Sequence, residues 1–212
     1  MKTFCHERWS KLWQSAGVAT EPLGWFDQLS KRYAEPQRHY HNVQHINECL
    51  REFDSARHLI AQPLAVEMAI WFHDAIYDPR APDNEERSAD LAKQCLSAAG
   101  IDRLIEPVSK LILATKHHVT DSSDGTVLLD IDLSILGQPE ERFFEYEKQI
   151  RREYEWVPEE TFGIKRAEIL QNFLNRPRLY TTDLFFSKYE RQARLNLEKS
   201  IRILGNVTDG AP

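Results

Sequence analysis

The sequence is poor in cysteine, and the cysteines it has do not form a framework. Cys5, Cys49 and Cys95 are far apart in a chain of 212 residues, without the spacing of a cysteine-based metal site. A sparse, odd count argues against a disulfide-stapled secreted fold and indicates a reducing compartment. Glycine is also scarce, with 8 residues, and no alternating apolar and polar pattern persists, so nothing in the pattern indicates a β-sheet.

The chain also lacks a long apolar run and an excess of positive charge. No run approaches the roughly 18 residues of a membrane span. The first eight residues carry charges where a signal peptide would have its apolar segment. The formal net charge of −6 does not match the footprint of a nucleic-acid-binding surface. We therefore expect a cytoplasmic protein with no membrane or nucleic-acid-polymer partner.

Helical periodicity is the dominant pattern in the sequence. Hydrophobic residues make up 42% of the chain, and they recur at the spacing of one helix face. Prolines stand at several helix starts, where their fixed backbone is tolerated. The pattern predicts an all-α fold of about eight to ten helices in one domain, with a polar loop over 120–125 and a frayed tail over 206–212. The expected helices cover about residues 4–16, 22–35, 42–58, 63–74, 83–99, 102–118, 127–136, 139–156, 158–175 and 182–204.

An apolar segment that begins at Ala69 ends on an adjacent histidine and aspartate, His73 and Asp74. An ionised carboxylate in apolar surroundings pairs with a cation, takes up a proton or binds a metal. Neighbouring residues do not share a helix face, so both can reach one ion only where the helix ends. The break at Asp78 and Pro79 predicts such an end. The alternative without a metal is a capped helix end with an ion-paired aspartate.

Two other segments offer ligands of the same kinds. His41 and His45 are four residues apart and would share one face of a helix. Asp130 and Asp132 interrupt an apolar helix and point about 200° apart, so that only one of them is expected to face the core. Taken separately, a surface pair of histidines and an aspartate paired with a buried cation would also explain these residues. Together, two imidazoles and two carboxylates suit a divalent ion such as Mn, Fe, Co, Ni, Zn or Mg.

The order of these residues resembles the HD superfamily of metal-dependent phosphohydrolases. The matching residues are His45, then His73 with Asp74, then Asp132, with gaps of 73 − 45 = 28 and 132 − 74 = 58 residues. The resemblance implies that the second aspartate of Asp130-Ile131-Asp132-Leu133 is the metal ligand, and Asp130 remains open. The resemblance to a bacterial group of predicted metal-dependent HD phosphohydrolases extends over 38–45, 72–77, 83–89, 115–118, 132–137 and 190–197.

The resemblance implies an HD-domain helical bundle over 1–212. Its metal-site core would span about 38–137, with C-terminal helices over 139–204 packed on it, and a homodimer is left open. The implied activity is hydrolysis of a small phosphorylated metabolite, such as a nucleotide, by a metal-activated water. Asp74 would also accept the proton of that water.

Three further residues have candidate roles in this reaction. Arg38 and Lys116 are candidate phosphate contacts, since Arg offers a planar fork and Lys a point charge. Ordinary solvation would explain both equally well. Glu85 is a candidate general acid or a carboxylate that supports the metal ligands, although an acidic residue in the first turn of a helix needs no catalytic reason.

A second metal is an open alternative. His117 and His118, with His41, could add ligands to a second ion that Asp74 bridges, as in HD proteins that bind two metals. A dinuclear iron site would allow the oxygenase chemistry of a few HD relatives. A third reading is non-catalytic, namely a nucleotide-sensing HD module.

Overall fold

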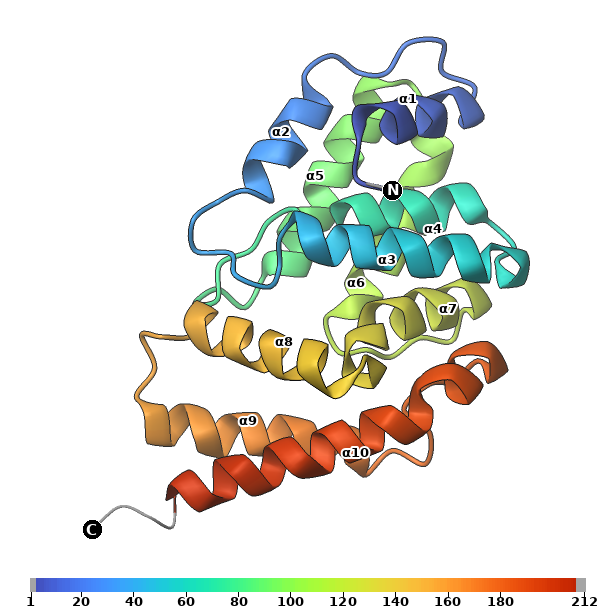
Figure 1. Ribbon diagram of the computed structural model, residues 1–212. Helices are drawn as coiled ribbons and strands as arrows, with labels where there is room; N and C mark the ends of the chain where they lie inside the picture. Colours follow the sequence, from blue (N-terminus) through green and yellow to red (C-terminus); the bar gives the residue numbers. More distant parts are fainter. Residues whose placement is uncertain (1–2, 209–212) are drawn as a thin grey trace. The chain divides into compact units, whose positions relative to one another are not determined.

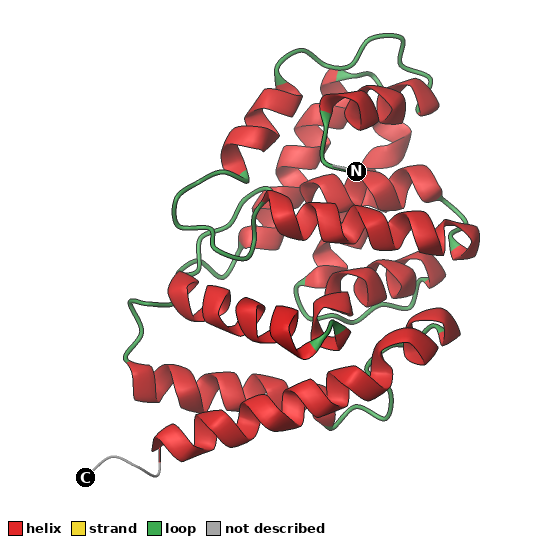
Figure 2. Cartoon of the chain, viewed as in Figure 1, coloured by secondary structure: helices red, strands yellow, loops and turns green. Residues whose placement is uncertain are grey.

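The computed structural model describes residues 3–208, and helices are the only regular secondary structure within them (Figure 1, Figure 2). The described residues form ten α-helices, three short 3₁₀ helices and no strand, which confirms the predicted all-α fold. The α-helices are α1 His6–Ser15, α2 Trp25–Arg32, α3 Val43–Ala56, α4 Pro63–Phe72, α5 Asn84–Ala98, α6 Ile105–Thr115, α7 Ser123–Asp132, α8 Glu140–Glu153, α9 Glu159–Leu174 and α10 Asp183–Thr208.

The chain divides into two compact units, Met1–Asp132 and Leu133–Pro212. The first unit holds α1 to α7 and every candidate site residue, and the second holds α8 to α10. The expectation of one HD-type domain over the whole chain stays a prediction.

The first unit is built around α4. Eight of its ten residues are buried, and its sequence is apolar almost all round, as a central helix requires. The Trp71 ring packs against Trp9 of α1, with ring centroids 5.2 Å apart. Because α4 is central, the residues that follow its last turn are delivered into the interior of the unit.

Two helix ends near the candidate site differ from the predicted ones. The helix expected over 102–118 has its α-helical part at Ile105–Thr115, which leaves the two histidines after it in a loop. The helix expected from residue 127 begins at Ser123, so the polar-loop prediction for 120–125 was wrong in its second half. The reason is a cap: the Ser122 hydroxyl accepts from the Gly125 backbone N–H at 3.3 Å, and the Ser122 carbonyl accepts from Thr126 at 2.8 Å.

Other differences from the predicted helix boundaries are smaller. The second helix begins at Trp25 rather than at Pro22, because Gly24 has a φ of 79° that ends the preceding turn. Residues 206–208 continue α10 instead of fraying, and residues 209–212 lie outside the described part of the chain.

The second unit has its own buried polar contacts. Arg166 of α9 donates to the Tyr146 hydroxyl at 2.7 Å and pairs with Glu147 of α8. Glu190 of α10 accepts from the backbone N–H groups of Leu179 and Tyr180 at 3.0 and 3.2 Å. Figure 1 shows α9 and α10 running alongside one another. None of the described helices is both long enough and apolar enough to cross a membrane.

Candidate metal centre

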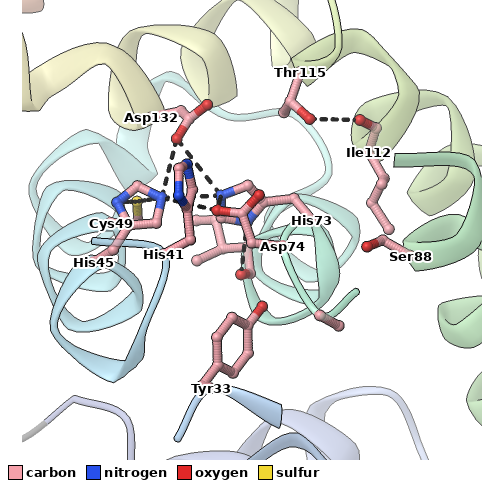
Figure 3. A network of polar contacts seen from close by, with 12 residues as sticks. Tyr33, His41, His45, Cys49, His73, Asp74, Ser88, Ile112, Thr115 and Asp132 are labelled. Carbon is pink, nitrogen blue, oxygen red and sulfur yellow. Dashed lines mark hydrogen bonds and ion pairs between the residues drawn. The ribbon is translucent and has the colours of Figure 1, made fainter. Parts of the chain in front are cut away.

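Three helix ends bring four of the predicted ligands together. His45 lies in the first turn of α3, His73 and Asp74 directly follow α4, and Asp132 is the last residue of α7. Asn42 caps the start of α3, since its side chain accepts from the Gln44 backbone N–H at 2.7 Å. Figure 3 shows the four side chains directed towards one another.

The nitrogen and oxygen atoms of these four residues lie at closely similar separations. His45 Nε2 is 3.1 Å from His73 Nε2, 3.4 Å from Asp74 Oδ2 and 3.2 Å from Asp132 Oδ1. His73 Nε2 is 3.2 Å from Asp74 Oδ2 and 3.5 Å from Asp132 Oδ1. Five of the six possible pairs therefore fall between 3.1 and 3.5 Å.

These separations match the edges of a coordination polyhedron. Ligands about 2.1 Å from a divalent ion lie about 3.0 Å apart in an octahedron and about 3.4 Å apart in a tetrahedron. Without an ion, two protonated ring nitrogens 3.1 Å apart would point their N–H groups at each other, and only the neighbouring carboxylates could offset that repulsion. The arrangement satisfies a metal ion better than it satisfies the two histidines alone.

Cys49 is the residue near this site that sequence reasoning missed. A buried group formed by His45, Cys49, His73 and Asp132 could hold a metal ion, with one potential ligand atom of each residue within 4.8 Å of the others. Cys49 follows His45 by four residues on α3, and that spacing could have revealed it. Its Sγ is 3.7 Å from both ring nitrogens of His45, so it lies beside the ring rather than ahead of Nε2.

In the metal-free protein, the aspartates of the site favour the charged state of the histidines, and the histidines favour the charged state of the aspartates. Burial opposes a charge on His73, but Asp74 and Asp132 outweigh it and raise the His73 pKa well above 6.5. Burial likewise opposes a charge on His45, and Cys49, Tyr40 and the two aspartates raise its pKa well above 6.5.

The two aspartates shift in the opposite direction. Burial would raise the pKa of Asp74, but His73, His41 and His45 hold it well below 3.8. Hydrogen bonds from His118, His45 and His73 overcome burial and hold the pKa of Asp132 well below 3.8. Both carboxylates are therefore ionised at neutral pH, which is the state that binds a cation.

Side chains fix the turn that carries His73 and Asp74. His73 Nδ1 lies 3.0 Å from the Ile70 carbonyl, and a proton held there leaves the Nε2 lone pair free to face the site. The Tyr33 hydroxyl donates to the Trp71 carbonyl at 3.0 Å. Two residues after Asp74, the Ser88 hydroxyl of α5 accepts from the Ile76 N–H at 3.0 Å and donates to the Ile76 carbonyl at 3.3 Å. The Trp71 carbonyl, in the last turn of α4, is thus satisfied by a side chain from outside the helix.

Arg38, in the segment before α3, contacts the same turn and is not positioned as a phosphate contact. Its side chain is 0% exposed, and its guanidinium donates to the carbonyls of Asp74, Ala75 and His41 and to the Glu35 carboxylate. The structure therefore gives no support to the predicted contact between Arg38 and a phosphate.

Lys116 and Glu85 belong to the same unit and are both partly exposed. Lys116 Nζ donates to the Pro82 carbonyl at 2.8 Å and pairs with Glu86, and this bond raises the Lys116 pKa. Its side chain is 27% exposed, so a phosphate contact would require an exchange of partners. Glu85, in the first turn of α5, is half-buried. The catalytic roles of Lys116 and Glu85 stay predictions.

The three histidines proposed for a second metal are placed differently. His118 Nε2 lies 3.3 Å from Asp132 Oδ2, the oxygen that does not face His45 and His73. Its φ of 50° is unusual for a residue with a side chain, and such strain gathers at functional sites. The His41 ring stacks on Tyr77, with centroids 4.1 Å apart. His117 is exposed.

Asp132, rather than Asp130, belongs to the group of potential ligands found among the described residues. Asp130 is buried in the same helix, two residues earlier.

Comparisons of the chain with protein-family models, with curated proteins and with solved structures found no match. Membership of the HD superfamily therefore stays a prediction.

Proposed function

We propose that the chain is a metal-dependent phosphohydrolase that acts on a small phosphorylated metabolite, with nucleotides as the first class to test. The observation that carries the proposal is the convergence of His45, His73, Asp74 and Asp132 at separations of 3.1 to 3.5 Å. Two imidazoles and two carboxylates are a ligand set for Mn, Fe, Co, Ni, Zn or Mg, with Asp74 preferred to Cys49 because its Oδ2 faces both ring nitrogens.

Hydrolysis of a phosphoester forms a bond from a water oxygen to phosphorus, breaks the ester P–O bond and leaves a proton on the departing oxygen. A divalent ion supplies charge neutralisation at the phosphoryl oxygens and a lowered pKa for water. Asp74 has an ionised carboxylate at the site and can accept the proton that the attacking water loses. Glu85 and Lys116 are the candidate groups for protonating the departing oxygen and contacting the phosphate.

The approach of His118 to Asp132 favours a second candidate function. A second ion held by His118 and His41, with Asp74 as the shared carboxylate, would give a dinuclear site, and with iron such a site would support oxygenase chemistry. The two candidates differ in stoichiometry: the oxygenase requires two irons per chain and a coloured protein.

The proposed hydrolase activity predicts metal-dependent release of phosphate. Purified, metal-stripped protein should be reloaded in turn with Mn, Co, Ni, Mg and Zn. Each form should be tested against a panel of phosphorylated metabolites, scored for both phosphate and pyrophosphate. We expect release from at least one substrate with at least one metal, because the loaded site would combine an electrophilic ion with a proton acceptor.

The control is Asp132→Asn protein purified in the same way, which should release nothing above background. If no substrate is hydrolysed with any metal, the hydrolase proposal fails. A ligand-induced rise in Tm without hydrolysis would then favour the nucleotide-sensing alternative.

A further inference from the structure

The Arg38 guanidinium joins two segments that each carry a candidate ligand. Nη1 donates to the Asp74 carbonyl at 2.6 Å and to the His41 carbonyl at 3.0 Å, and Nη2 donates to the Ala75 carbonyl at 3.0 Å. Nε donates to Glu35 at 3.0 Å. One buried side chain thus links the segment before α3 to the turn after α4.

The surroundings of the guanidinium hold it in place. It lies 5.3 Å from the centre of the Tyr33 ring and 5.6 Å from the centre of the Tyr77 ring, distances at which a cation is attracted to an aromatic face. A cation is also favourable where the carbonyls of a helix end gather, as they do after α4. Arg38 is therefore fully engaged by backbone and aromatic groups, and its charge stabilises the turn itself.

We propose that Arg38 is a positioning residue for Asp74: it fixes the Asp74 and Ala75 peptides, so that the Asp74 carboxylate meets the two histidines before any metal binds. This inference rests on the proposed metal site. In this proposal Arg38 affects the affinity of the site for metal and does not contact a phosphate. Lysine cannot take over this role, because a single ammonium does not reproduce a planar fork that reaches carbonyls of two segments.

The test compares Arg38→Lys with Arg8→Lys. Arg8 is a matched control, since it is also a largely buried arginine that uses its whole fork, on Glu67 and Asp54, at 2.6 to 2.8 Å. For Arg38→Lys we expect the dissociation constant for Co²⁺ to rise by about 10- to 100-fold, the range for partners that orient metal ligands. Arg8→Lys should leave it unchanged. At saturating metal, the KM for a phosphorylated substrate should be unchanged in both.

Hydrogen exchange of the metal-free protein provides a readout that does not depend on metal. The Ala75 N–H bonds to the Phe72 carbonyl at 2.9 Å, and the Ile76 N–H bonds to Ser88. Both amides should exchange faster in Arg38→Lys, and not in Arg8→Lys, if Arg38 holds the turn. Should Arg38→Lys fail to fold, Glu35→Ala removes one anchor of the fork and should produce the same changes to a smaller extent.

The outcomes separate the two proposals. Unchanged exchange and unchanged Co²⁺ affinity would overturn the positioning role, and so would a raised KM with normal metal affinity, which would indicate a phosphate contact. If wild-type protein binds no Co²⁺, the proposed function fails, while the exchange of Ala75 and Ile76 still decides whether Arg38 holds the turn.

Discussion

Asp132→Asn is expected to lose metal binding, whereas Asp130→Asn keeps it. Both substitutions remove one carboxylate from the same helix, two residues apart. Asp132 Oδ1 lies 3.2 Å from His45 Nε2 and 3.5 Å from His73 Nε2, and the group of potential ligands found among the described residues includes Asp132 and not Asp130. Loss of a group that orients a ligand already costs about 10- to 100-fold in metal affinity, so the loss of a ligand should cost more than about 100-fold. The measurement is metal content per chain after dialysis against limiting metal, with helicity followed by circular dichroism.

His73→Ala and Asp74→Ala should behave like Asp132→Asn, because each removes one of the converging groups. The assignment would be refuted if both variants retained stoichiometric metal in a folded protein. Loss of metal in Asp130→Asn alone would instead move the fourth ligand to Asp130, which the sequence left open.

Metal affinity is expected to rise steeply with pH. In the metal-free protein the pKa values of His45 and His73 lie well above 6.5, so the metal must displace at least one proton on binding. Each displaced proton makes the apparent affinity change about tenfold per pH unit over the range in which the histidines hold it. The measurement is the dissociation constant between about pH 6 and about pH 8, with proton release counted by calorimetry in buffers of different ionisation enthalpy.

The same shifts predict the opposite trend for stability without metal. The raised histidine pKa values contribute stability that is complete below pH 6.5 and is lost as the pH rises through them. The lowered aspartate pKa values contribute stability that is present above pH 3.8 and is lost as the pH falls through them. This cluster should therefore stabilise the metal-free protein most between pH 3.8 and 6.5.

For the pH dependence of metal binding, a dissociation constant that stays flat across the tested range would contradict this description of the site.

The fold was predictable from the sequence because its signals are local. The apolar stretch of α4, the Asn42 cap and the prolines before α8 and α9 mark helices through contacts within a few residues. The start of α7 was missed because the Ser122 cap lies inside a stretch that reads as a polar loop. Local patterns thus predicted which helices exist better than where each one begins.

The candidate site was predictable only in part, because it depends on contacts between helices. The order of His45, His73, Asp74 and Asp132 suggested a shared site through the resemblance, and the structure brings these side chains together. The placement of Arg38 was not predictable, since it depends on which carbonyls the turn after α4 leaves unpaired.

The different positions of His117 and His118 could not be predicted from the sequence either. His118 has a positive φ and approaches Asp132, while His117 is exposed. Sequence spacing alone treats the two as equivalent, because it does not show the positive φ of His118 or its approach to the end of α7.

The most direct test of the metal centre is the anomalous diffraction of crystals loaded with Co²⁺ or Zn²⁺. We expect an anomalous peak about 2.0 to 2.2 Å from His45 Nε2, His73 Nε2, Asp74 Oδ2 and Asp132 Oδ1. A second peak beside His118 would favour the dinuclear alternative. The absence of any peak among these four side chains in fully loaded crystals would contradict the account.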